Sequence, residues 1–190
     1  MKGKSMGKSA SRIKRYRQPG LDRLFERADK QWEAGKLRSA FCLFLACAKA
    51  GDSGCRVNLG TFYRDGIGVK PNRERALYWY RRAYRQGEGA AASNIGVLYR
   101  DERKLKQALA WFERAKDGDA YLAIARIYLE EKDQTMAIRY LRRTLQSNPE
   151  KMSEASRDEA EGLLKNLLPR AHKPPGGGRR GQRVEGNGSG

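Results

Sequence analysis

NLGTFYRD begins at Asn58 and NIGVLYRD begins at Asn94, so nearly the same eight residues return after 36 positions. Between the two copies lie a glycine-containing turn over residues 65–72 and a segment in which apolar residues recur at i, i+3, i+4 and i+7, the pattern of a helix. One period therefore predicts a pair of helices joined by a turn. Because a pair of this size cannot bury its apolar faces alone, a period of roughly 20 to 50 residues predicts stacked copies, an α-solenoid.

Weaker copies flank this stretch on both sides. The third copy has a turn that is four residues shorter, and the upstream and fourth copies keep only their apolar positions. We expect an all-α fold with negligible strand, an α-solenoid of about four helix-pair repeats plus a C-terminal capping helix over residues 154–168. The residues that define the weaker copies are Ala40, Leu43, Phe44 and Cys47 upstream, Ala108, Trp111, Phe112 and Ala115 in the third copy, and Tyr128, Ala137 and Leu141 in the fourth.

Several helix ends can be predicted from single residues. Gly51, Gly87 and Gly118 each follow an outer helix and precede an acidic residue, which predicts a positive-φ helix end and a favourable charge at the next helix start. Asn72 is placed to cap the helix that follows the glycine turn. The expected bounds of the first two helices are 21–34 and 37–50.

The second copy also carries a family resemblance. Its Leu59-Gly60, the turn Asp65-Gly66-Ile67-Gly68-Val69, and the pair Trp79-Tyr80 resemble the Sel-one-like repeat family, which is related to the tetratricopeptide repeat. The third copy, with its shorter turn, moves towards the plainer tetratricopeptide form. The resemblance extends over about residues 21–147. It implies a helical-repeat fold and a role as an interaction scaffold, without implying any chemistry or naming a partner.

The charge of the chain is concentrated at its ends. The net charge is +18; residues 1–20 contain seven basic residues and no acid, and residues 170–190 contain five basic residues and one acid. Both segments are poor in the apolar residues that offset the entropy of ordering. We therefore expect three parts, a basic disordered leader (1–20), the solenoid (21–169), and a Gly/Arg-rich disordered tail (170–190).

The three cysteines, Cys42, Cys47 and Cys55, are odd in number and contain no CxxC pair. This pattern favours reduced core residues in a reducing compartment, with redox sensing as the alternative. The leader has no apolar core for secretion, and no window offers the roughly 20 apolar residues of a membrane span. We expect a cytoplasmic protein without membrane insertion, the alternative being a mitochondrial transit sequence in the leader.

Catalytic and metal chemistry have little basis in this sequence. The single histidine, His172, lies in the tail, which leaves the predicted core without a Ser/His or Cys/His pair or a histidine-based metal site. Paired acids such as Glu130-Glu131 fall at predicted helix ends, where they are expected to be solvated. We predict no enzyme activity, no cofactor and no metal.

The first function hypothesis is a scaffold that binds a protein or peptide partner in the concave groove of the solenoid. Equivalent positions of the inner helices share one helical face, and a side-chain amide on that face can bind a peptide backbone. The alternative for the apolar members is packing between helices, which makes the two asparagines the stronger candidates. The candidate groove residues are Asn58, Thr61, Phe62, Asn94, Leu98 and Arg126.

The second hypothesis, from another class, is nonspecific association with RNA or DNA. Arginine-glycine and basic aromatic segments follow phosphate backbones without reading bases. A face of outer-helix arginines, including Arg81, Arg82, Arg114 and Arg143, could add to this, unless it is an ordinary solvated face. An acidic protein is the other partner that this charge favours. The candidate polyanion contacts are Arg12, Lys14, Arg15, Arg17, Arg179, Arg180 and Arg183.

Overall fold

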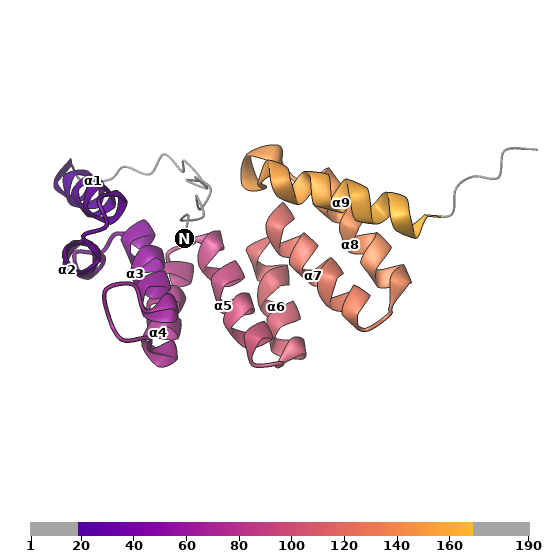
Figure 1. Ribbon diagram of the computed structural model, residues 1–190, viewed down its shortest axis with the longest axis horizontal. Coiled ribbons are helices and arrows are strands. Elements are labelled where there is room, and N and C mark those ends of the chain that lie inside the picture. Colours follow the sequence, from indigo (N-terminus) through magenta and orange to yellow (C-terminus); the bar gives the residue numbers. More distant parts are fainter. Residues whose placement is uncertain (1–18, 169–190) are drawn as a thin grey trace, which may run out of the picture.

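The computed structural model describes residues 19–168, which form nine α-helices and one short 3-10 helix, with no strand among them. Successive helices pack as antiparallel pairs, and the pairs follow one another in a row that the last helix crosses at one end (Figure 1). The described part of the chain is an all-α solenoid, as predicted. The helices are α1 Pro19–Glu33, α2 Leu37–Lys49, α3 Ser53–Asp65, α4 Arg73–Arg85, α5 Gly89–Asp101, α6 Leu105–Ala115, α7 Gly118–Glu130, α8 Gln134–Gln146 and α9 Glu154–Leu167, with the 3-10 helix at Pro149–Lys151.

Each helix pair is held together by a small residue that faces a large one. A Cβ added at Gly60 would lie 2.5 Å from the Tyr80 ring, and one added at Gly96 would lie 2.7 Å from the Phe112 ring. The first helix therefore approaches the second closely only because these positions lack a side chain. In the fourth pair the position of the glycine holds Ala125 and the position of the aromatic ring holds Leu141, a smaller side chain, and both residues are fully buried.

Neighbouring pairs are joined by apolar residues on a second face of each first helix. In α3 the Phe62 ring contacts the rings of Trp32, 5.2 Å between centroids, and Phe44, 5.3 Å, from the preceding pair. The predicted Trp79 is buried on the outer helix of the same pair, with 9% of its surface exposed. Stacking of each pair on its predecessor thus extends one core along the row.

The glycine turn between α3 and α4 forms as predicted. Gly66 and Gly68 both have positive φ, 71° and 67°, and a Cβ at Gly68 would lie 2.6 Å from the Leu37 carbonyl group. The turn therefore packs directly on the start of α2, where only glycine fits. Asn72 caps α4 by accepting a hydrogen bond from the Arg75 N–H at 2.8 Å.

The prediction for Gly118 is wrong. Gly51 and Gly87 have positive φ at the ends of outer helices, but after α6 the left-handed residue is Lys116, with φ of 56°. Gly118 is instead the first residue of α7, where a Cβ would lie 2.5 Å from the Ser147 hydroxyl oxygen. Asp117 caps this helix by accepting from the Ala120 N–H at 2.7 Å. The glycine there is required by close packing rather than by a left-handed turn.

The other predicted boundaries agree within two residues. α1 runs Pro19–Glu33 and α2 runs Leu37–Lys49, and the predicted capping helix is α9. The domain boundaries at 20 and 169 fall at the edges of the described range, so the division into leader, solenoid and tail stays a prediction.

Candidate functional site

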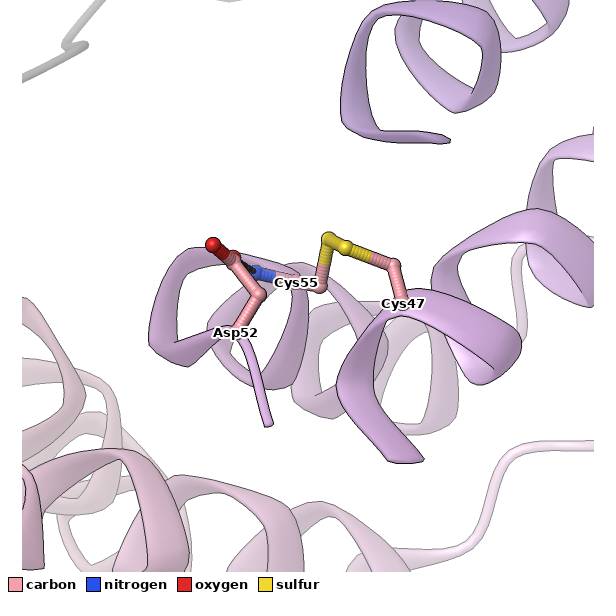
Figure 2. A group of neighbouring side chains, drawn as sticks. All are labelled: Cys47, Asp52 and Cys55. Atoms are coloured by element: carbon pink, nitrogen blue, oxygen red, sulfur yellow. Dashed lines mark hydrogen bonds between the residues drawn. A yellow bond between two sulfur atoms is a disulfide. The ribbon is translucent and has the colours of Figure 1, made fainter. Parts of the chain in front are cut away.

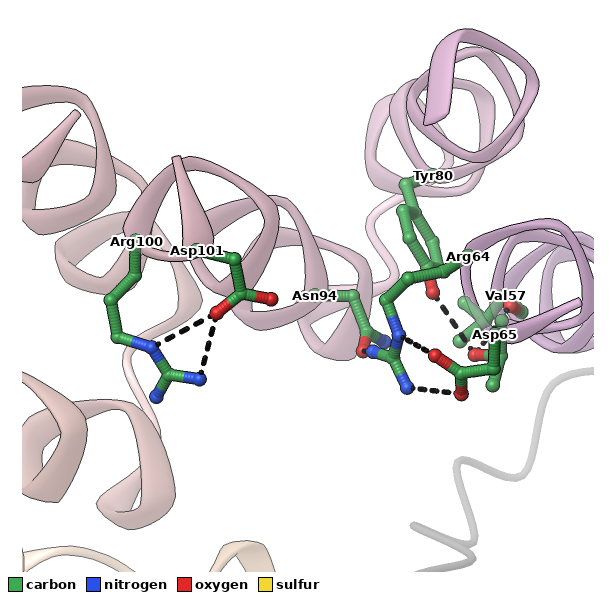
Figure 3. A network of polar contacts seen from close by, with 8 residues as sticks. Val57, Arg64, Asp65, Tyr80, Asn94, Arg100 and Asp101 are labelled. Carbon is green, nitrogen blue, oxygen red and sulfur yellow. Dashed lines mark hydrogen bonds and ion pairs between the residues drawn. The ribbon is translucent and has the colours of Figure 1, made fainter. Parts of the chain in front are cut away.

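The two candidate asparagines occupy equivalent positions on α3 and α5 but differ in their contacts. The Asn94 amide accepts a hydrogen bond from Arg64 Nη1 at 2.9 Å (Figure 3). It also donates one to the Ala90 carbonyl at 3.1 Å. Asn58 is partly exposed, and its side chain makes no hydrogen bond within residues 19–168. Asn94 is therefore fixed in orientation, whereas the Asn58 amide keeps its donor and acceptor capacity.

An arginine-aspartate pair closes each of these helices. Arg64 donates two hydrogen bonds to Asp65, at 2.6 and 2.8 Å, and Arg100 donates two to Asp101, at 3.4 and 3.2 Å (Figure 3). The hydrogen bond to Asp65 raises the pKa of the Arg64 guanidinium above its usual value. Because Arg64 also donates to Asn94, its side chain links the C-terminal end of α3 to α5. Tyr-Arg-Asp occurs at the end of both helices, but this repetition does not predict the hydrogen bond between Arg64 and Asn94.

The remaining groove candidates on α3 and α5 are used inside the fold. Thr61 lies 3.0 Å from the Tyr80 hydroxyl and donates to the Val57 carbonyl at 3.3 Å. Phe62 is fully buried and Leu98 is 6% exposed, because both pack against the preceding helix pair. The packing alternative holds for these two apolar residues, so neither is available to a partner.

Arg126 is engaged by the capping helix. Its guanidinium pairs with both carboxylate oxygens of Glu159 on α9, with an Nε to Oε1 distance of 2.7 Å. These hydrogen bonds lower the pKa of the Glu159 carboxyl. α9 packs on α7 and α8, so it covers the α7 part of the predicted groove at Arg126. The α3 and α5 parts of that face are not covered by α9.

The cysteine prediction is wrong. Cys47 and Cys55 form a disulfide between the end of α2 and the start of α3 (Figure 2). Cys42 is exposed and lies outside this disulfide. The two sulfurs and the Asp52 carboxylate lie within 4.8 Å of one another, a spacing that could suit a metal ion if both thiols were reduced. In the disulfide form no thiolate is available, and Asp52 caps α3 by accepting from the Cys55 N–H at 2.7 Å. The disulfide also removes the argument from reduced cysteines to a reducing compartment, so the cytoplasmic location stays a prediction.

The candidate polyanion contacts of the leader and tail lie outside the described residues, as does His172. Arg81, Arg82, Arg114 and Arg143 of the outer helices all make contacts within the fold. For example, Arg82 donates to the Tyr78 hydroxyl at 2.7 Å, and Arg143 pairs with Glu113 at 3.0 Å. Across residues 19–168, no helix has the length and apolar character needed to cross a bilayer.

Two family models match this chain. The Sel1 repeat matches residues 55–88 and 90–119, and the tetratricopeptide repeat matches residues 118–151. The third copy, which was expected to drift towards the tetratricopeptide form, thus still matches the Sel1 repeat, and the change comes in the fourth copy. A sel1-like repeat-containing protein of Acanthamoeba polyphaga mimivirus is 30% identical over 76 residues, which are 38% of this chain and 14% of that protein.

Two solved structures share the fold. A Sel1 repeat protein from Oxalobacter formigenes has a TM-score of 0.60 at 19% identity, over 75% of this chain and 60% of its own. A protective antigen of uropathogenic Escherichia coli that displays an SLR fold has a TM-score of 0.61 at 21% identity, over 77% of this chain and 34% of its own. With the family matches and the stacked helix pairs, these similarities identify the chain as a Sel1-like, tetratricopeptide-like helical repeat protein.

Proposed function

We propose that this protein is a non-enzymatic interaction scaffold whose α3–α5 face binds a partner polypeptide. Sel1 and tetratricopeptide repeats generally mediate protein–protein interaction, which supports the coarse assignment. The assignment of the α3–α5 face rests on one observation, that an asparagine and an arginine-aspartate pair occur on α3 and again on α5, one period apart. Asn58, Arg64 and Asp65 form one such set.

The spacing of the two sets suits an extended chain. Packed helices lie about 10 Å apart, and a β-strand rises about 3.3 Å per residue. Anchors on α3 and α5 would therefore meet main-chain groups roughly three residues apart on a bound peptide. The Asn58 amide, which has no side-chain hydrogen bond within residues 19–168, can accept from one backbone N–H and donate to one carbonyl, while Arg64 and Asp65 offer charges beside it.

A peptide-selection experiment tests this assignment. Peptides selected from a random library on the full chain are measured against wild type, Asn58→Ala and Asn166→Ala. Asn166 is the matched control, because it is an exposed asparagine of α9 with no hydrogen bond to the described part of the chain. We expect Asn58→Ala to cost about 1 to 3 kcal/mol of binding at any moderate salt concentration and Asn166→Ala to cost nothing measurable. Equal affinities of all three proteins would refute the α3–α5 face.

A pull-down from native lysate, with and without nuclease, separates the protein-binding function from the nucleic-acid alternative. A partner held by the helical face survives nuclease and is lost from Asn58→Ala. Material that disappears with nuclease and persists in Asn58→Ala would favour association through nucleic acid.

A further inference from the structure

The first helix pair breaks the apolar pattern by which the other pairs stack. In the second, third and fourth pairs, the first helix (α3, α5 and α7) places three apolar or aromatic residues against the preceding pair. At the equivalent positions α1 carries Arg27, Lys30 and Gln31. This face has no preceding pair to cover within residues 19–168, so its polar side chains suit a solvent-exposed end. The apolar triads are Leu59, Phe62 and Tyr63 in α3, Ile95, Leu98 and Tyr99 in α5, and Ile124, Ile127 and Tyr128 in α7.

A pocket of about 600 Å³ lies on this face between α1 and α2. Arg27 and Lys30 of α1 and Arg38 of α2 line it, and no acidic residue of the described chain does. All three cations are exposed, and none forms an ion pair within residues 19–168. The positive charge of this pocket is therefore not balanced by its own walls.

The acids of α1 form a stripe that borders Lys30 but not Arg27. Asp22, Glu26, Asp29 and Glu33 recur at i, i+4, i+7 and i+11, so they form one stripe along α1. Burial, and then the proximity of Glu33, raises the pKa of Asp29, which indicates that the stripe is crowded with like charge. Glu26 and Glu33 lie four and three residues from Lys30 and share part of the helix surface with it, whereas no acid lies three or four residues from Arg27 or Arg38. The excess positive charge of the pocket therefore rests on the two arginines.

The rest of the lining is suited to a peptide. Gln31 and Ser39 offer hydrogen-bonding groups, and Leu43 and Cys42 supply less polar wall. Two arginines on opposite walls can each take a carboxylate with two parallel hydrogen bonds. The pocket is an open hollow on the surface, so it suits a short peptide segment that lies across it, whereas backbone tracking of a nucleic acid uses an extended groove.

We propose that this end pocket binds an acidic polypeptide segment through Arg27, Lys30 and Arg38. We assign the occupant to another molecule, because residues 1–20 and 170–190 are themselves basic: the first segment holds seven cations and no acid, and the second holds five cations and one acid. The pocket is lined by residues of α1 and α2 alone and shares none with the α3–α5 face. It gives the scaffold a second, electrostatic docking point.

The test uses the full chain and a fluorescein-labelled glutamate-rich octapeptide in fluorescence anisotropy near physiological salt. The pocket variant is Arg27→Gln/Lys30→Gln/Arg38→Gln, which avoids charge reversal and keeps the helices intact. The matched control is Lys106→Gln/Arg139→Gln/Arg142→Gln, which removes the same charge from exposed sites on α6 and α8. We expect the pocket variant to weaken binding by at least about tenfold and the control by less than about threefold. Equal weakening would show only bulk electrostatic attraction and would overturn the proposal.

Cys42 provides a positional readout in the same protein. It is the single cysteine outside the disulfide, and it lies on the pocket wall. Saturating acidic peptide should slow its alkylation by iodoacetamide in wild type and in the control variant, but not in the pocket variant. Unchanged alkylation in all three proteins would overturn the site. If a single-stranded oligonucleotide of the same charge bound more tightly than the peptide and protected Cys42, the pocket would bind nucleic acid instead.

Discussion

Gly96→Ala tests whether the glycine of each Sel1 repeat sets the distance between its two helices. Gly96 lies inside α5, where replacing glycine by alanine ordinarily stabilises a helix by about 1 kcal/mol. The new Cβ, however, would lie 2.7 Å from two ring carbons of Phe112, well inside the usual 3.5 to 4.0 Å contact between carbons. Overpacking of a core costs about 1 to 3 kcal/mol. We therefore expect a net loss between zero and about 2 kcal/mol in the free energy of unfolding, instead of the gain of about 1 kcal/mol at an open helical site.

The fourth repeat suggests how to restore the fit. There the same two positions hold Ala125 and Leu141 instead of glycine and phenylalanine. Phe112→Leu alone should destabilise by leaving a cavity, on the order of 1 kcal/mol. The double variant Gly96→Ala/Phe112→Leu should lose less than the sum of the two single losses, by at least about 1 kcal/mol, because the residues are in contact.

Urea denaturation followed by circular dichroism measures these changes, with Gly162→Ala as control. Gly162 is exposed inside α9, and nothing lies within 4 Å of an added Cβ. This substitution should stabilise by up to about 1 kcal/mol, since only the helix preference changes. If Gly96→Ala stabilised the protein as Gly162→Ala does, the close approach of Phe112 would not be the reason for the glycine. Additive losses in the double variant would refute the same reasoning.

Reduction of the Cys47–Cys55 disulfide should lower the free energy of unfolding by about 2 to 3 kcal/mol, because the crosslink restricts the unfolded chain. The melting temperature measured with and without a dithiol checks this. The Cys42→Ser variant, which keeps the disulfide, should respond like wild type. The pKa of Tyr140 is raised to about 12 by burial and by its hydrogen bond to Glu113, so its contribution to stability is complete below about pH 10, the unfolded pKa, and is lost as the pH rises towards 12. Tyr140→Phe should remove one late step from an ultraviolet phenolate titration, and an unchanged titration would contradict this. The pKa of Glu159 is lowered by its pairing with Arg126, so this pair stabilises α9 fully above the ordinary glutamate pKa of about 4.3, and the stabilisation is lost as the pH falls through the pKa of the folded state. Amide hydrogen exchange in α9 should therefore accelerate as the pH falls through that value in wild type but not in Glu159→Gln.

The features that the sequence could predict are those that repeat or that act locally. The 36-residue period predicts the helix pairs, and Asn72 caps α4 through a contact three residues away. Trp79 could be placed in the core from helical spacing alone. Each of these follows from chemistry within one helix or one turn.

The features that were missed depend on contacts between copies. Cys47 and Cys55 are eight residues apart, and only the chain reversal between α2 and α3 brings their sulfurs together. Arg64 and Asn94 are 30 residues apart, and their hydrogen bond depends on the stacking of α5 on α3. Gly118 was assigned to a turn by analogy with Gly51, but the shorter connection after α6 gives the left-handed conformation to Lys116 instead.

The same distinction separates the residues that build the stack from the cations of the end pocket. Residues shared by all copies are explained by the stack itself, since Gly60 and Gly96 meet aromatic rings and Phe62 and Leu98 fill the space between pairs. A departure from the period with no packing reason must be explained otherwise. A solvated end requires only polar residues, which glutamate would satisfy as well as arginine. The choice of Arg27, Lys30 and Arg38, all of one sign and without ion-pair partners in the described chain, therefore exceeds what solubility of that end requires. An acidic ligand gives this charge a role that neither packing nor solvation supplies.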